Sequence, residues 1–218
     1  MREAFSQELH QLDEQVRQLF ALVSEGLAGA TEALLSGDRE AARALVARDT
    51  LIDRLYLDVE TVVQRQFALQ APLAADLRFL LSVLRMVPEL ERSGDLTEHI
   101  AQRAARGLTA ELSPRVRGLI EQMGRLGVQM WQEATRAYEA RDGGATRRLS
   151  ALDDDLDDLH VSFIAEVAGS VAPVPVVIEL ALLGRFYERL GDHAVNLAAR
   201  LEYIVTGAAG REPAATGE

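Results

Sequence analysis

The chain has 218 residues, of which 48% are hydrophobic and 26% charged, the composition of a folded globular protein and not of a disordered one. Aromatic residues make up only 5%, and Ala, Leu, Arg and Glu dominate, which favours helices over a β-sandwich. The formal net charge of −11 argues against general nucleic-acid binding, because an acidic surface repels phosphate backbones. The absence of cysteine excludes disulfides, thiolate metal sites and cysteine nucleophiles.

Apolar residues recur at helical spacing through almost the whole chain. The first helix is expected to carry its apolar stripe from Leu9 to Leu34. Ser36-Gly37-Asp38 then supplies a left-handed C′ glycine and an N-cap aspartate for the next helix. The second helix is expected from Arg39 to Gln70 and the third from Leu73 to Arg106, because Ala71-Pro72 interrupts the pattern.

The second half of the chain shows the same order of elements. Ser113-Pro114 is expected to open the fourth helix as N-cap and first-turn proline. The fifth helix is expected over about Ala145 to Ala168, the sixth over about Val176 to Thr206, and the tail from Gly207 to Glu218 is expected to fray. We therefore predict an all-α fold of two tandem antiparallel three-helix bundles, over residues 1–108 and 109–218.

An internal duplication relates these two halves. At an offset of 104 residues, Asp49-x-x-x-Asp53 matches Asp153-x-x-x-Asp157. At an offset of 97, Glu91-Arg92-Ser93-Gly94-Asp95 recurs as Glu188-Arg189-Leu190-Gly191-Asp192. The offset thus falls by seven residues, which a hairpin shortened by about one turn on each arm would produce. The last two helices of each half are therefore expected to pair antiparallel.

The matched acidic residues form four pairs, and a spacing of four residues puts both carboxylates of a pair on one helix face. Such like-charge pairs cost a few tenths of a kcal/mol each, so their repetition points to a function. An antiparallel hairpin would bring two pairs together as an oxygen-rich site for a hard cation: magnesium, manganese, iron or calcium. His99 and Asn196 follow one turn later, and His99 offers a nitrogen ligand or a hydrogen bond to a carboxylate.

Spacing alone leaves other interpretations open. The run from Asp153 to Asp158 is also what a solvated acidic helix face shows, with Arg92 and Arg189 as ordinary salt-bridge partners. A metal-dependent enzyme is the alternative function, although His99 is the only acid–base candidate nearby. A purely structural bundle is a third hypothesis, and no residue is predicted to be catalytic.

No sequence run approaches the roughly 18 apolar residues of a membrane span. The nearest candidate, Val171 to Gly184, contains two prolines and Glu179. The charged N-terminus lacks the apolar segment of a signal peptide. We therefore expect a cytoplasmic protein.

The duplicated helical unit and its paired acids resemble the PhoU family of phosphate-transport accessory proteins, over about residues 3–206. The segment Tyr187-Glu188-Arg189-Leu190-Gly191-Asp192-His193-Ala194-Val195-Asn196 is especially similar to the signature of the family's second repeat. The first repeat departs from it, because Leu96 stands where the second repeat has His193 and His99 stands where it has Asn196.

This resemblance implies a non-enzymatic regulator that restrains phosphate uptake and holds off the phosphate-starvation response when phosphate is plentiful. The implied partners are the ATPase of the phosphate ABC transporter and the phosphate sensor histidine kinase, with membrane association only through them and with a homodimer as the assembly. The implied cofactor is a metal: a multinuclear iron cluster, magnesium or manganese. Carried onto this sequence, its ligands are Asp49, Asp53, Glu91 and Asp95 in the first half, and Asp153, Asp157, Glu188 and Asp192 in the second.

Overall fold

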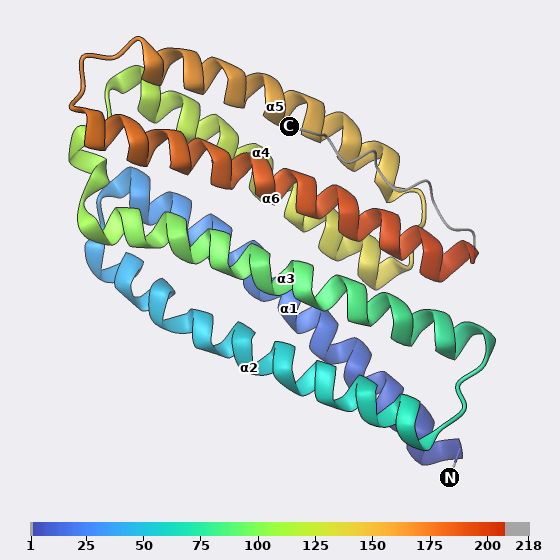
Figure 1. Cartoon of the computed structure of the whole chain (residues 1–218). Helices are drawn as coiled ribbons and strands as arrows, with labels where there is room; N and C mark the ends of the chain where they lie inside the picture. The colour runs from blue at the N-terminus through green and yellow to red at the C-terminus, as the bar shows by residue number, and fades with distance from the viewer. Residues whose placement is uncertain (1, 208–218) are drawn as a thin grey trace.

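The computed structural model describes residues 2–207, and within that range it is all-helical (Figure 1). The six α-helices confirm the predicted fold class. The expected fraying of the tail falls on residues 208–218, outside the described residues. The elements are α1 (Arg2–Ser36), α2 (Arg39–Leu69), α3 (Ala74–Arg106), the short 3-10 helix η1 (Leu108–Glu111), α4 (Pro114–Ala140), α5 (Ala145–Ala168) and α6 (Val174–Thr206).

The helix ends follow local signals in the sequence. The carboxylate of Asp38 accepts hydrogen bonds from the first free N–H groups of α2, at 3.0 and 2.9 Å, and so caps the helix. Ser113 caps α4 in the same way, with its hydroxyl accepting from the N–H of Val116 at 3.2 Å. Gly37 and Gly107 take positive φ angles of 78° and 89° where α1 and α3 end, a conformation that side-chain-free glycine adopts without strain. The 3-10 helix was not predicted.

Each half of the molecule packs as its own three-helix unit. α1, α2 and α3 contact one another, as do α4, α5 and α6, and the two units meet through α3 with α6 and α1 with α4. Figure 1 shows α2, α3, α6 and α5 side by side in that order, with α1 and α4 behind them. The boundary between residues 108 and 109 stays a prediction.

The two hairpins differ in length in the way that the change of offset predicted. Aligned on the duplication, α5 ends at the position of Gln64, whereas α2 continues to Leu69. In the same alignment α6 begins at the position of Leu77, whereas α3 begins at Ala74. Both arms of the α5–α6 hairpin are therefore shorter by about one turn.

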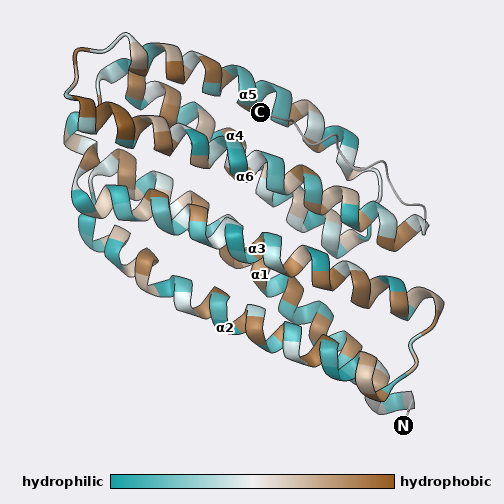
Figure 2. Ribbon diagram, in the orientation of Figure 1, coloured by the Kyte–Doolittle hydropathy of each residue, from teal (hydrophilic) through white to brown (hydrophobic). Residues whose placement is uncertain are grey.

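The interior is filled by the apolar stripes of all six helices, which alternate with polar residues along each ribbon (Figure 2). The large buried side chains satisfy their polar atoms. The indole N–H of Trp131 donates to the carbonyl of Leu190 at 3.0 Å, and the hydroxyls of Tyr187 and Thr31 bond to each other at 2.9 Å. These bonds fix α6 against α4 and α1, which holds the repeated motif of α6 in place.

Among the described residues, one helix is long and apolar enough to pass as a membrane span by length and composition alone, over Phe5–Ser36. The sequence prediction overlooked it and named Val171 to Gly184 as the nearest candidate. α1 nevertheless packs against α2, α3 and α4, and its residues Leu12, Val16 and Leu19 are fully buried. It is the core helix of this fold, which explains its low charge.

Candidate metal centre

The four predicted ligands of the first half lie on facing sides of the α2–α3 hairpin. Asp49 and Asp53 come from α2, and Glu91 and Asp95 from α3. Burial is the largest cause of the raised pKa of Asp49, and repulsion from the carboxylates of Asp53, Asp95 and Glu91 raises this pKa further. The fold thus brings the two pairs together, as the antiparallel hairpin predicted.

The second half repeats this arrangement on the α5–α6 hairpin. Asp153 and Asp157 come from α5, and Glu188 and Asp192 from α6. Asp192, Asp157 and Glu188 all act on Asp153. Eight acidic side chains therefore form two clusters of four, one in each half, which we call the first-half cluster and the second-half cluster.

The glycine of each repeated motif makes room for its cluster. A Cβ atom on Gly191 would lie 2.5 Å from Oδ1 of Asp153 and 2.7 Å from Cδ2 of Leu156. A Cβ atom on Gly94 would lie 2.8 Å from Cδ1 of Ile52 and 3.4 Å from Oδ1 of Asp49. Asp49 of α2 therefore lies against the backbone of Gly94 on α3, and Asp153 of α5 against the backbone of Gly191 on α6.

Partial burial and mutual repulsion make both clusters hard to ionise. Burial first, then the neighbouring acids, raises the pKa of Asp49 and of Asp153 to about 7. The pKa values of the α3 and α6 members are raised too, with burial as the largest cause; these are Glu91, Asp95, Glu188 and Asp192. In each half, three carboxylates with raised pKa values therefore lie in a site whose negative charge a cation would offset.

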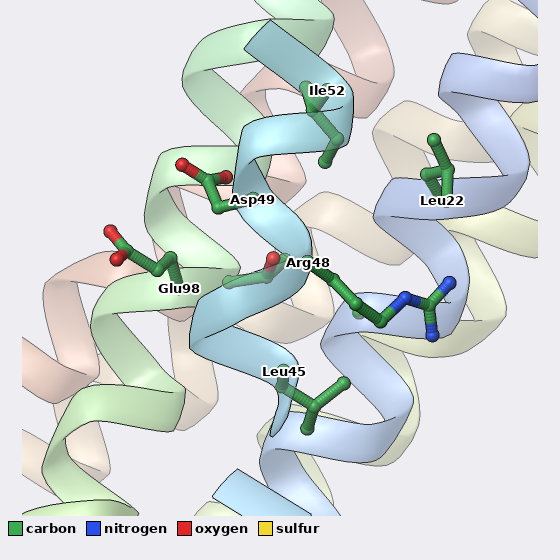
Figure 3. Close-up of a pocket in the computed structure, with 8 residues that line it drawn as sticks. Leu22, Leu45, Arg48, Asp49, Ile52 and Glu98 are labelled. Carbon is green, nitrogen blue, oxygen red and sulfur yellow. The ribbon is translucent and has the colours of Figure 1, made fainter. Parts of the chain in front are cut away.

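The clusters differ in the basic side chains beside them. In the second half, Arg185 pairs with one oxygen of Glu188, and a guanidinium nitrogen of Arg189 lies 3.9 Å from Asp192. Within residues 2–207, no member of the first-half cluster has an ion-pair partner. Arg48, the residue before Asp49 in the chain, instead pairs with Glu25 of α1 at 3.0 Å. Figure 3 shows the Arg48 side chain pointing away from Asp49.

Two further residues belong to these surroundings and were missed in the sequence. Glu98 on α3 is, after burial, the largest cause of the raised pKa of Asp49, and Figure 3 shows the two carboxylates on the same side of the hairpin. His160 on α5 has a buried Nε2 that finds no hydrogen-bond partner among the described residues. Glu98 lies seven residues after Glu91, and His160 lies seven residues after Asp153. Helical spacing therefore places each of them on the same helix face as a predicted ligand.

His99 and Asn196, which the sequence placed at equivalent positions, do different things. The ring of His99 lies against Phe186 with the centroids 5.3 Å apart, and its charge acts on Asp95. Asn196 turns to the seam between the two halves and donates to Glu89 at 2.8 Å. The nitrogen ligand considered for the first half therefore has no counterpart at Asn196.

A hydrogen bond at that seam joins the two repeated motifs. The hydroxyl of Ser93 donates to the carbonyl of Glu89 at 2.6 Å, which uses its only proton. His193 must therefore donate from Nδ1 to the Ser93 oxygen, at 2.9 Å. Since Ser93 lies between Glu91 and Asp95, and His193 follows Asp192, this bond connects the two motifs that carry the α3 and α6 acids.

The residues present suit a hard cation in their chemistry. All eight donors are carboxylates, and Oδ1 of Asp153 and Oε2 of Glu188 are buried without a hydrogen-bond partner in the described part of the chain. As the side chains stand, no group of three or more His, Asp or Glu residues in residues 2–207 is arranged to hold an ion. The assignment of the eight ligands stays a prediction.

Comparison with known proteins settles which family this fold represents. The family model described as PhoU domain matches residues 5–104 and 120–201, one match in each half. The chain belongs to the PhoU family. It is 32% identical over 211 residues to the phosphate-specific transport system accessory protein PhoU homolog 2 of Mycobacterium tuberculosis, covering 95% of this chain and 99% of that protein.

Solved PhoU structures have the same architecture. PhoU from Pseudomonas aeruginosa superposes with a TM-score of 0.86 at 28% identity, covering 94% of this chain and all of that one. The phosphate transport system regulatory protein PhoU from Streptococcus pneumoniae gives 0.83 at 26% identity, with coverage of 95% and 100%. These matches confirm the family predicted from the sequence.

The PhoU assignment also decides between the predicted kinds of function. The chain is a PhoU phosphate-transport accessory and regulatory protein, and the family is non-enzymatic. The prediction that the chain is not an enzyme is confirmed, and the alternative of a metal-dependent enzyme is set aside.

Proposed function

We propose that this chain is a cytoplasmic adaptor that represses phosphate uptake and phosphate-starvation signalling when phosphate is plentiful. Its partners would be the ATPase of the phosphate ABC transporter and the phosphate sensor histidine kinase. It would act as a homodimer and reach the membrane only through those partners. The names of its relatives, an accessory protein and a regulatory protein of phosphate transport, support a role beside the transporter.

The two acidic clusters carry the second part of the proposal, a bound metal in each half. Asp49, Asp53, Glu91 and Asp95 would hold one site, and Asp153, Asp157, Glu188 and Asp192 the other. When bound, iron, manganese or magnesium would supply positive charge that links the two arms of a hairpin. The observation that supports this is the pKa of about 7 at Asp49 and Asp153, which burial raises first and the neighbouring acids raise further, so that ionising these groups carries a cost that a cation offsets.

The chain's own residues suggest how the two halves would act as one unit. α3 and α6 lie in contact, and the Ser93–His193 bond ties the motif of one cluster to the motif of the other. A change in the distance between the two helices of either hairpin would therefore shift residues on the other side of the α3–α6 contact. An adaptor transmits a signal only if it binds the different states of its partners with different affinity. The affinity of this chain for a partner must therefore depend on how far apart the two helices of a hairpin lie.

The partner proposal is tested by binding. The purified chain is mixed with the transporter ATPase and, separately, with the cytoplasmic region of the kinase, in high phosphate. Binding to both supports the adaptor, and binding to neither overturns it.

The metal proposal is tested by metal analysis of protein purified without chelator, together with its melting temperature before and after chelation. Stoichiometric metal and a lower melting temperature after chelation are expected, because a ligand that binds only the folded state stabilises it by mass action. Sub-stoichiometric metal in both halves would instead support the purely structural bundle with solvated acidic faces.

A further inference from the structure

The α5–α6 hairpin exposes a set of large apolar side chains that no other part of the described chain covers. The start of α6 is brown in Figure 2. We call this set the hairpin patch; its members are Val161, Ile164, Val171, Val174, Ile178 and Leu182. Large exposed apolar side chains gathered on one hairpin point to an interaction site in a folded protein.

The part of the hairpin patch formed by the connecting loop and the start of α6 is almost free of charge. Glu179 is the only charged residue between Val167 and Gly184, and it is held by Arg103 of α3 at 2.9 Å. Pro173 at the end of the connecting loop and Pro175 in the first turn of α6 fix two φ angles, so this segment loses little entropy when it binds. A rigid, uncharged, apolar surface has the character of the centre of a protein interface.

One border of the hairpin patch is strongly acidic. Asp154 and Asp158 lie seven and three residues before Val161, on the same face of α5. Both are exposed, and neither has an ion-pair partner among residues 2–207. The occupant that complements this surface has an apolar centre and Arg or Lys side chains along one edge.

The same charges argue against the other occupants. A second copy packed with its two-fold axis at this acidic border would bring its own Asp154 and Asp158 near the first pair, and like charges repel. An anionic lipid surface would repel the acidic border as well.

We propose that the hairpin patch is the docking surface for a protein partner that presents an apolar groove with a basic rim. This inference rests on the proposed adaptor function, which supplies the two candidate proteins. It adds the face by which the adaptor holds at least one of them.

The duplication provides a matched control for the test. Val161 and Ile178, 68% and 53% exposed, correspond to Leu57 and Leu81 of the first half, 56% and 39% exposed. The double variants Val161→Glu/Ile178→Glu and Leu57→Glu/Leu81→Glu therefore make the same charge change at equivalent exposed positions. Circular dichroism checks that both fold.

Affinity of the full chain for the transporter ATPase and for the kinase cytoplasmic region is then measured by calorimetry. We expect Val161→Glu/Ile178→Glu to weaken at least one complex by more than about tenfold, and Leu57→Glu/Leu81→Glu to change it by less than about threefold. Asp154→Asn/Asp158→Asn should slow association and reduce its salt dependence. Equal effects of the two glutamate variants, or none, overturn the inference while the adaptor function stands.

Two further measurements exclude the other occupants. Flotation with vesicles of phosphatidylethanolamine and phosphatidylglycerol, and molar mass by light scattering, are compared between the wild-type chain and Val161→Glu/Ile178→Glu. Vesicle binding or dimerisation that only the variant loses overturns the inference in favour of a lipid surface or a second copy. If the wild-type chain binds neither candidate protein, the adaptor function fails first, and the docking surface fails with it.

Discussion

The first-half and second-half clusters share four acids at matched positions but differ in how their charge is compensated. In the first half Glu98 also acts on Asp49, as Asp154 acts on Asp153 in the second, and Arg48, the residue before Asp49 in the chain, pairs with Glu25 instead. The second-half cluster has Arg185 on Glu188 and Arg189 near Asp192. The duplicated backbone has kept the ligands and changed their surroundings.

That difference assigns unequal roles to the two clusters. An arginine already paired with a carboxylate must be displaced before a cation can use that carboxylate, which costs part of the binding energy. Among the described residues, no carboxylate of the first-half cluster is held in such an ion pair. We therefore expect the first half to bind metal more tightly than the second.

The largest effect is expected from removing ligands in one half at a time. Asp49→Asn/Asp53→Asn should abolish binding in the first half, and Asp153→Asn/Asp157→Asn in the second. Each should weaken metal affinity of its own half by at least about 100-fold, because even outer-shell changes cost roughly 10–100-fold. Metal content per chain and calorimetric titration measure the loss.

Both variants should melt above the wild-type chain in chelator, because each removes carboxylate repulsion. Asp155→Asn/Asp158→Asn is the matched control on the exposed face of α5, and its metal content should stay at the wild-type level. A loss of metal in the control equal to that in the ligand variants would show that the two clusters bind metal no more specifically than other acidic residues of the surface.

A second test compares the glycines that hold the clusters open. Gly191→Ala should lower the free energy of unfolding by about 1–3 kcal/mol, the usual cost of overpacking, and should displace Asp153 from the cluster. Gly94→Ala should cost less, because the nearest atoms of Ile52 and Asp49, Cδ1 at 2.8 Å and Oδ1 at 3.4 Å from the added carbon, lie farther away than those at Gly191. Urea unfolding in chelator measures both.

The control for the glycine pair is Gly118→Ala on α4. An added Cβ there has no atom within 4 Å, so only helix propensity acts, and a gain of up to about 1 kcal/mol is expected. If Gly94→Ala and Gly191→Ala lose the same stability, the closer approach of Asp153 has no energetic meaning.

A smaller effect should come from the arginine that distinguishes the halves. In the Asp49→Asn/Asp53→Asn background, which leaves only the second-half cluster, Arg185→Ala should tighten metal binding by about tenfold, or about 1.4 kcal/mol. Arg48→Ala in the Asp153→Asn/Asp157→Asn background should change first-half binding by less than about twofold. Weaker binding after Arg185→Ala would mean that the arginine orients Glu188 for the metal.

The helices and the duplication were predictable because their signals are local. Asp38 and Ser113 cap helices by bonds to residues two or three positions away, and Gly37 ends a helix through its own φ angle. The offset between the halves changes by seven residues within the hairpin that joins the last two helices of each half. That change predicted the antiparallel pairing of α5 with α6, because it involves only this one hairpin.

The surroundings of the clusters were not predictable in the same way, because they depend on packing between helices. Arg48 and Arg185 each lie near a cluster in the sequence, yet one turns to α1 and the other to Glu188. The bond from Ser93 to His193 depends on how the two halves meet, which spacing within one helix does not reveal. Spacing in the sequence predicts the acids of each cluster, and only the fold shows which basic side chains lie beside them.

The smallest effect expected is a pH dependence of stability in chelator, with opposing contributions. Asp49 has a folded pKa of about 7, above its unfolded value, so it stabilises the fold at low pH and this contribution is lost as pH rises from about 4 to about 7. Burial lowers the pKa of His193 to about 4, so its contribution is lost as pH falls below about 6.5. The raw pH profile therefore mixes two slopes of opposite sign.

Comparing Asp49→Asn with the wild-type chain cancels the histidine contribution. In chelator, the variant should gain stability relative to the wild type as pH rises from 4 to 7, by about 1 kcal/mol after solvent screening of a half-exposed group. Asp153→Asn should gain stability relative to the wild type over the same pH range, because burial is the largest cause of the raised pKa of Asp49 and of Asp153. Such a gain found in one half alone would show that the counter-charges, and not burial, control ionisation of the clusters.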